Sequence, residues 1–158
     1  MRAELTVRAA RARDVPALAA LSTELGYPAD AGQIEERLSV LLASDSDAVF
    51  VAEAERAGIV GFVHGGERRL LVSEPFVELG GLIVAAAARR RGAGALLLAA
   101  VERWALARGV DLVRVRSRRE RDVADVVYRR CGFDLEKEQR VFTKRLAQPS
   151  TAEPPHSS

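Results

Sequence analysis

The sequence predicts a single α/β domain built on a mixed β-sheet, and three patterns carry this prediction. Two apolar runs, at 48–54 and 59–64, are separated by four residues that end in a glycine, which is the pattern of an antiparallel β-hairpin. An apolar run at 76–84 leads through a short loop into helical periodicity at 92–108 and then into an alternating run at 110–116. Strand–helix–strand order makes the last run parallel to the central one, so the sheet is mixed.

The rest of the chain supplies further elements to the same domain. Asp14 can cap a first helix, and Asp30 with Gln33 resembles a capping box for a second helix. The remaining predicted elements are a strand at 5–10, helices at 15–25, 31–42 and 122–131, and a final antiparallel pair of strands at 133–137 and 140–146. Together with the three patterns, these elements make about seven strands and four helices.

Length and composition indicate a globular protein. The chain has 158 residues, of which 48% are hydrophobic and 29% are charged, and its formal charge of +2 does not favour nucleic-acid binding. Arg89–Arg91 interrupt the longest apolar stretch before it reaches the roughly 18–20 residues that cross a bilayer, so no membrane span is expected. The single cysteine, Cys131, cannot form an internal disulfide, and the N-terminus lacks a secretory pattern, so we expect a cytoplasmic protein.

The C-terminal end differs in composition from the rest of the chain. Residues 148–158 contain no aliphatic side chain larger than alanine, so they cannot contribute to a core. We therefore expect a folded domain at 1–147 and a disordered tail at 148–158. Two distant histidines and one cysteine have no metal-ligand spacing, so no metal is expected.

The loop between the central strand and the helix at 92–108 has the composition of an anion-binding site. Gly92 and Gly94 let the backbone approach a ligand, the first helical amides lack intrahelical partners, and the arginines at 89–91 add positive potential. A pyrophosphate fits such a loop, and the alternative is an ordinary turn with solvated arginines. The stretch lacks the Gly-Lys-Ser/Thr ending of a P-loop and the Gly-x-Gly-x-x-Gly fingerprint of a dinucleotide-binding fold.

Arg89-x-x-Gly92-x-Gly94 after Leu82-Ile83-Val84 resembles the acyl-CoA-binding motif of the GNAT superfamily of N-acyltransferases. Two later stretches are also similar to GNAT segments, namely Glu102-Arg103-Trp104-Ala105 followed by Gly109, and Tyr128-x-x-x-Gly132-Phe133. The resemblance implies a three-layer α/β fold with a central mixed, mostly antiparallel sheet of about seven strands, a splayed parallel pair and four helices. It also implies an acyltransferase.

The same resemblance implies an acetyl-CoA site along the central strand and the loop. The loop amides hold the pyrophosphate, and the strand lies along the pantetheine arm. A bulge at Gly80-Gly81 aims a backbone N–H at the thioester carbonyl. The residues implied to bind the cosubstrate are Leu82, Ile83, Val84, Arg89, Arg90, Arg91, Gly92, Ala93, Gly94, Ala95 and Ser117. The sequence departs from the family after Ser117, since Arg118 stands where members often carry asparagine.

Amide formation from a thioester needs a base for the amine and an acid for the departing thiolate. Glu78 on the central strand is the candidate base, and the alternative is an edge carboxylate paired with Arg116 or His64. Tyr128 is the candidate acid, because a phenol stays protonated at neutral pH, and the alternative is an aromatic core residue. His64 is a candidate catalytic residue, but a lone histidine near a strand end is more often a hydrogen-bonded structural residue, and we favour that interpretation.

In GNAT members the first two helices border the acceptor pocket, which makes Glu24 and Tyr27 candidate substrate-binding residues; the alternative is a surface turn. The sequence thus predicts an acetyl-CoA-dependent N-acetyltransferase acting on a primary amine of a small molecule. A protein or peptide N-acetyltransferase and a non-catalytic acyl-CoA-binding module remain open as alternatives. The expected partner is the amine substrate, with neither nucleic acid nor membrane, and a homodimer is left open.

Overall fold

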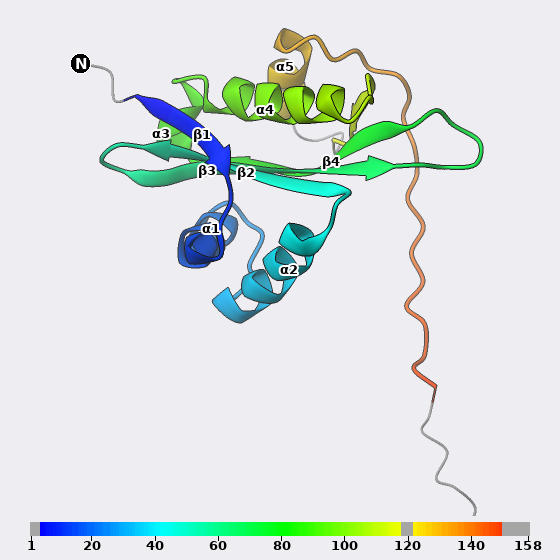
Figure 1. Ribbon diagram of the computed structural model, residues 1–158, viewed down its shortest axis with the longest axis horizontal. Coiled ribbons are helices and arrows are strands. Elements are labelled where there is room, and N and C mark those ends of the chain that lie inside the picture. The colour runs from blue at the N-terminus through cyan, green and yellow to red at the C-terminus, as the bar shows by residue number, and fades with distance from the viewer. Residues whose placement is uncertain (1–3, 118–121, 150–158) are drawn as a thin grey trace, which may run out of the picture.

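The computed structural model describes residues 4–117 and 122–149 of the chain. A β-sheet lies between two layers of helices, as Figure 1 shows. Helices α1 (Val15–Glu24) and α2 (Ala31–Ala43) cover one face of the sheet, and α4 (Ala93–Ala107) and α5 (Asp122–Arg130) cover the other. The predicted three-layer α/β class is confirmed.

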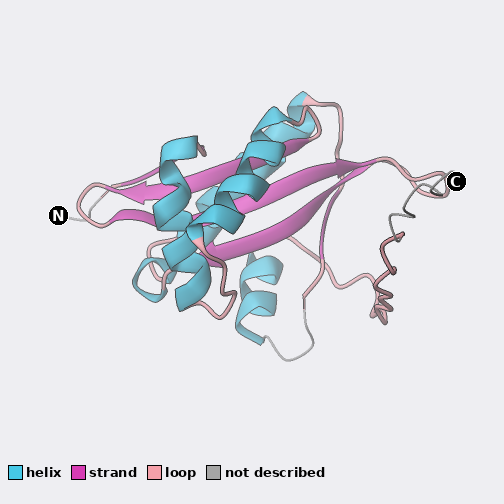
Figure 2. Ribbon diagram, turned by 90° about the horizontal axis from the view of Figure 1, so that it is seen from below, coloured by secondary structure: helices cyan, strands magenta, loops and turns pink. Residues whose placement is uncertain are grey.

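Five strands form the described sheet, and they lie in the order in which they occur in the chain. Their bounds are β1 Leu5–Ala9, β2 Asp47–Ala54, β3 Gly58–Arg68, β4 Phe76–Val84 and β5 Val113–Val115. Neighbours pair antiparallel except β4 and β5, which are parallel, and Figure 2 shows the sheet with its helices. The mixed sheet and its parallel pair therefore agree with the prediction from strand–helix–strand order.

The β2–β3 hairpin turns at Gly58, whose φ of +72° favours glycine, and β3 runs on to Arg68. The sequence predicts an end at His64, because Gly65 and Gly66 weaken the local strand signal. Pairing with strands on both sides outweighs that signal. Gly65 is also needed for packing, because a Cβ there would lie 3.0 Å from a methyl group of Val101 on α4.

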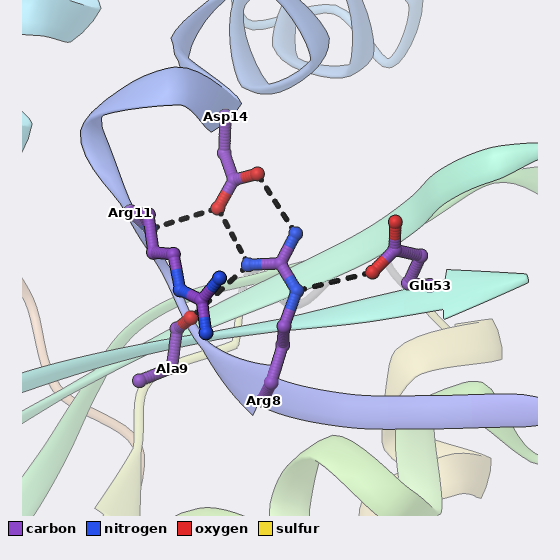
Figure 3. A network of polar contacts seen from close by, with 5 residues as sticks. All are labelled: Arg8, Ala9, Arg11, Asp14 and Glu53. Atoms are coloured by element: carbon purple, nitrogen blue, oxygen red, sulfur yellow. Dashed lines mark hydrogen bonds and ion pairs between the residues drawn. The ribbon is translucent and has the colours of Figure 1, made fainter.

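The start of α1 differs from the predicted cap. Asp14 lies at the N-cap position but makes no side-chain hydrogen bond to the helix. Its carboxylate instead accepts hydrogen bonds from the Arg11 amide at 2.7 Å and from the Arg8 guanidinium at 2.8 and 2.9 Å, as Figure 3 shows. Glu53 on β2 accepts a third bond from Arg8, at 3.0 Å. Asp14 therefore ties the short 3-10 turn η1 (Ala12–Asp14) to the first strand instead of capping α1. At the start of α2, by contrast, the predicted capping box formed by Asp30 and Gln33 is present.

Helix α4 covers the centre of the sheet and ends before Gly109, which has the positive φ of +77° expected for a left-handed cap. Leu97, Leu98 and Val101 on its inner face are buried against strand residues such as Val63. A one-turn helix, α3 (Ala86–Arg89), stands before the loop where the sequence predicts no helix. No helix in the described part of the chain has the length and apolarity that a membrane crossing requires.

The predicted final strands at 133–137 and 140–146 are not formed in the described structure. Residues 134–149 run away from the sheet in an extended path without strand pairing, as Figure 1 shows. Their large apolar side chains are exposed, namely those of Leu135, Val141, Phe142 and Leu146. Alternation of residue types favours a strand, but a strand also needs an edge to pair with. Residues 150–158 of the predicted tail lie outside the described residues.

Candidate active site

The bulge predicted in the central strand lies at Gly80. His64 on β3 is the partner of Gly81, and the next residue, Gly65, is the partner of Leu79, so Gly80 has no cross-strand partner. On its other edge β4 pairs with β5 only through residues 77–79. The half of β4 that follows the bulge is thus not paired with β5, and this separation is the splayed parallel pair that the family resemblance implies.

The loop after β4 ends in a helix start that is suited to an anion. Gly92, the N-cap of α4, has φ +78°, and helical hydrogen bonding begins with the Leu96 amide, which donates to the Gly92 carbonyl at 3.1 Å. The amides of residues 93–95 therefore have no acceptor within the helix, and the helix dipole adds positive potential there. Arg90 and Arg91 are exposed beside them.

Two of the predicted loop residues have roles other than direct contact through a side chain. Arg89 turns back, and its Nε donates to the carbonyl of Val84 at 3.1 Å, which closes the loop onto the end of β4. Gly94 faces the interior: a Cβ there would lie 3.7 Å from Val127 on α5 and 4.0 Å from Val84. These are ordinary van der Waals distances, so Gly94 lies against β4 and α5, and its backbone amide is the group that it can offer to a ligand.

Glu78 lies on β4 two residues before the bulge, and a quarter of its side chain is exposed. Its carboxylate is ion-paired with Arg68 Nε at 3.5 Å and with Arg116 Nε at 3.7 Å. The pairing with Arg116 is the one that the sequence offers as the structural alternative to a base. His64, the other partner considered, binds Asp47 instead.

Sequence reasoning missed Asp47, the first residue of β2. Asp47 Oδ1 accepts a hydrogen bond from His64 Nε2 at 2.8 Å, and its Oδ2 accepts one from Ser44 Oγ at 2.8 Å. Burial raises the pKa of the Asp47 carboxyl, but these two hydrogen bonds together with the nearby charges of His64 and Arg68 lower it by more, so that it lies below its ordinary value. The hairpin register could have revealed the pair, since Asp47 lies opposite Gly66, two positions after His64.

Tyr128 lies on the other side of the sheet from Glu78. Its half-buried ring meets the ring of Phe133 edge-on, with centroids 5.7 Å apart, and packs against the core under α4. The structure therefore gives the aromatic-packing alternative a physical basis. Ser117 is exposed and ends the described stretch, and Arg118 lies outside it.

The two predicted acceptor residues lie at the end of α1 and in the loop after it. Glu24 is exposed, and Tyr27 is 39% exposed. The Tyr27 amide donates to the carbonyl of Ser22 at 2.8 Å, which fixes the turn. Asp47, His64, Glu78 and Gly80 share the sheet face that α1 and α2 cover, because their neighbours in the strands pack under α4. The structure thus places several polar groups and both acceptor candidates on one side of the sheet.

Comparison with known proteins identifies relatives that span nearly the whole chain. A sequence model of the acetyltransferase (GNAT) family matches residues 16–133. The aminoglycoside N(6')-acetyltransferase type 1 of Stenotrophomonas maltophilia is 35% identical over an alignment of 149 residues, which covers 92% of this chain and 95% of that protein.

Solved structures agree on the fold. The aminoglycoside N-acetyltransferase AAC(6')-Iy in complex with CoA has a TM-score of 0.83 and 23% identity, covering 92% of this chain and 98% of its own. The 6'-N-acetyltransferase AAC(6')-Ih from Acinetobacter baumannii has a TM-score of 0.81 and 16% identity, covering 91% and 100%. The likeness to these structures shows the shared fold, and the family match runs from α1 through strands β2–β5 and the loop to α5, leaving out β1. The chain therefore belongs to the GNAT family of acetyltransferases, and it is an acyltransferase.

Proposed function

We propose that the protein transfers an acetyl group from acetyl-CoA to a primary amine of a small polycationic molecule of the aminoglycoside class. The observation that carries this proposal is the charge of residues 14–47. Their helices, α1 and α2, cover the face of the sheet on which Glu78 lies. Between Asp14 and Asp47 the chain has seven acidic residues and one basic residue, Arg37, although its overall formal charge is +2. Five of those acidic side chains are exposed, namely Glu24, Asp30, Glu35, Glu36 and Asp45.

An acidic layer of this kind attracts a molecule that carries several ammonium groups and raises its local concentration. It also disfavours acidic acceptors by repulsion. The 35% identical relative is an aminoglycoside N(6')-acetyltransferase, which supports the same acceptor class. The acceptor amine would approach Glu78 from the α1–α2 side, past Glu24 and Tyr27.

The proposed cosubstrate site uses the loop and the second half of β4. The amides of residues 93–95 and the guanidinium groups of Arg90 and Arg91 would bind the pyrophosphate, and Leu82–Val84 would lie along the pantetheine arm. Ser117 remains a proposed contact, two residues after the end of β5. The structure of AAC(6')-Iy was solved in complex with CoA, which supports acetyl-CoA as the cosubstrate here.

Charge reversal in this loop tests the cosubstrate site. Arg91→Glu should weaken CoA binding by ~10–100-fold, because a charge-assisted hydrogen bond is worth about 1.5–3 kcal/mol and each 1.4 kcal/mol changes Kd tenfold. Calorimetric titration with CoA measures the change. Arg103→Glu on the exposed side of the same helix is the matched control and should leave Kd unchanged. Equal Kd values for both variants and wild type would refute the pyrophosphate assignment.

The proposed reaction is direct attack of the amine on the thioester. Glu78 accepts a proton from the ammonium group, directly or through water, and the free amine attacks the thioester carbon to form a tetrahedral intermediate. A backbone N–H at the Gly80 bulge stabilises its oxyanion, and Tyr128 protonates the departing thiolate. Holding the two reactants in line supplies about 7–11 kcal/mol of the lowering of the barrier.

Glu78→Gln should lower turnover most at acidic pH and displace the rising limb of the pH–rate profile, because a base works only in its ionised form. Initial rates from pH 5 to 9 measure this effect, with the protonation of the amine substrate measured separately. Glu53→Gln, which removes another ion-paired carboxylate of the sheet, is the control and should leave the profile unchanged. An unaltered profile in Glu78→Gln would assign Glu78 to ion pairing with Arg68 and Arg116.

Thiol release from acetyl-CoA tests the function as a whole. The assay is run with a panel of three acceptor amines, namely an aminoglycoside, a simple primary alkylamine and a peptide with a free N-terminus. The proposal expects the highest kcat/KM with the aminoglycoside. Thiol release that no amine accelerates, in a protein that binds CoA, would instead identify a non-catalytic acyl-CoA-binding module.

A further inference from the structure

The pair formed by His64 and Asp47 has no part in the reaction outlined above, yet it lies beside the bulge. His64 is the β3 residue at which the register shifts, opposite Gly81. A Cβ on Gly80 would lie only 2.5 Å from His64 Nδ1. The imidazole therefore occupies the space that a side chain at the bulge would fill.

A second glycine gives the pair room on its other side. A Cβ on Gly66 would lie 2.8 Å from Asp47 Oδ1 and 3.8 Å from His64 Nε2. The pair is thus held between two positions, Gly66 and Gly80, at which any larger residue would displace it. Both side chains are partly open to solvent, with 25% of His64 and 23% of Asp47 exposed.

Hydrogen bonding orients the ring. An ionised carboxylate only accepts hydrogen bonds, so His64 Nε2 carries the proton that points at Asp47 Oδ1, 2.8 Å away. In the neutral ring Nδ1 is then the acceptor, and Nδ1 is the atom that faces Gly80. Ser44 holds the second oxygen of Asp47, so the carboxylate is fixed from two sides. A base oriented by a carboxylate in this way is a recurring catalytic arrangement.

The charged groups around the ring come from several elements. Asp47 faces it from β2, Glu78 lies two residues from Gly80 on β4, and Arg68 and Arg116 are ion-paired with Glu78. The residues that helix α1 buries are uncharged, namely Val15, Leu18, Ala19, Leu21 and Ser22, and its one charged residue, Glu24, is exposed at its C-terminal end. Of these groups, the Asp47 carboxylate is the one in direct hydrogen-bonding contact with the ring.

We propose that His64 is a further catalytic residue, which accepts through Nδ1 the second of the two protons that the acceptor nitrogen loses. This inference rests on the proposed function. The ammonium group loses one proton before attack, and the new C–N bond leaves the nitrogen positively charged until a second proton departs. Glu78 attracts the ammonium group as an anion and takes the first proton, and the neutral imidazole takes the second as the C–S bond breaks.

The protons balance over one turnover. Glu78 and His64 each receive one proton from the nitrogen and later release it to solvent. Tyr128 gives one proton to the sulfur and regains one from solvent. The net result is one amide, one CoA thiol and one proton released.

His64→Gln tests the assignment, because glutamine can still donate a hydrogen bond to Asp47 but cannot accept a proton at neutral pH. We expect kcat to fall ~10²–10⁴-fold, with unchanged Kd for CoA and a shallower acid limb of the pH–rate profile. The chain's other histidine, changed in His156→Gln, serves as the matched control and should have no effect. In His64→Ala, added imidazole should restore part of the lost rate, which a structural role cannot explain.

The outcomes separate this inference from the function on which it rests. A wild-type protein that acetylates no amine of the panel overturns the proposed function and the assignment of His64 with it. An active wild type whose rate and pH profile are matched within about threefold by His64→Gln overturns the assignment of His64 alone. A loss of rate in His64→Gln that imidazole does not relieve in His64→Ala, with a parallel loss of CoA binding, makes His64 a structural residue and also overturns it.

Discussion

Tyr128→Phe should lower kcat ~10²–10⁴-fold, the range typical of general acid catalysis, with little change in stability or in the Kd for acetyl-CoA. The substitution keeps the ring that meets Phe133 edge-on at 5.7 Å and deletes only the phenolic proton. It therefore separates an acid from a packing residue better than alanine would. Single-turnover and steady-state rates, measured side by side, give the change in the chemical step even where product release is slow.

The packing alternative makes the opposite prediction for Tyr128→Phe. It expects near-normal kcat and at most the modest loss of stability that follows the removal of one hydroxyl hydrogen bond, about 0.5–1.5 kcal/mol. Phe133→Leu is a useful control, because it disturbs the same ring contact without touching the proposed acid. Single-turnover rates of wild type and Tyr128→Phe within about threefold of each other would show that the thiolate takes its proton from elsewhere.

Asp14→Ala should cost about 3–5 kcal/mol of the free energy of unfolding, the largest effect on stability that we expect from one substitution. Asp14 is 4% exposed and accepts hydrogen bonds from Arg8 and from the Arg11 amide. Its removal leaves the Arg8 guanidinium, which is 18% exposed, without its closest counter-charge. Glu53 still accepts one bond from Arg8, which favours the lower end of the range.

Urea unfolding measures this cost, and Glu53→Ala is the matched control. Glu53 is 43% exposed, so its loss should cost no more than about 1 kcal/mol. Equal, small losses for the two variants would show that Arg8 is adequately solvated without Asp14 and would refute the account of the buried pair.

The same contact predicts how stability depends on pH. The hydrogen bonds from Arg8, only partly offset by burial, lower the pKa of the Asp14 carboxyl in the folded state. A carboxyl with a lowered folded pKa adds stability that is fully present above its unfolded pKa, about 3.9, and is lost as the pH falls through the folded value. Wild type should therefore lose more stability than Asp14→Ala as the pH falls below about 4.

The parts of the fold that the sequence predicts well are those in which local patterns and long-range packing agree. The central strand has the predicted bounds 76–84, because its apolar run is long and pairs with β3 along its length, and the glycines at 80–81 mark the bulge. The parallel strand is shorter than its alternating run at 110–116, because only residues 113–115 lie along β4 before the strands separate. The strand signal at 133–137 and 140–146 is equally local, but those residues find no pairing edge in the described structure.

The site was harder to predict, because its contacts join residues that are distant in sequence. Asp47 and His64 are 17 positions apart and meet only through the hairpin register. Arg89 and Gly94 fit a family motif as ligand contacts, yet the structure directs Arg89 to the Val84 carbonyl and packs Gly94 against β4 and α5. A motif identifies the loop, but only the backbone path decides which residues contribute a side chain and which contribute an amide.

A competition experiment tests the central claim of acetyl transfer to a small polycationic amine most directly. The protein is incubated with acetyl-CoA and equal concentrations of an aminoglycoside and a peptide with a free N-terminus, and mass spectrometry counts the acetyl groups on each. The account predicts a singly acetylated aminoglycoside, one CoA thiol released for each acetyl group transferred, and an unmodified peptide. Acetylated peptide beside unmodified aminoglycoside, or no acetylated product from a protein that binds CoA, would contradict it.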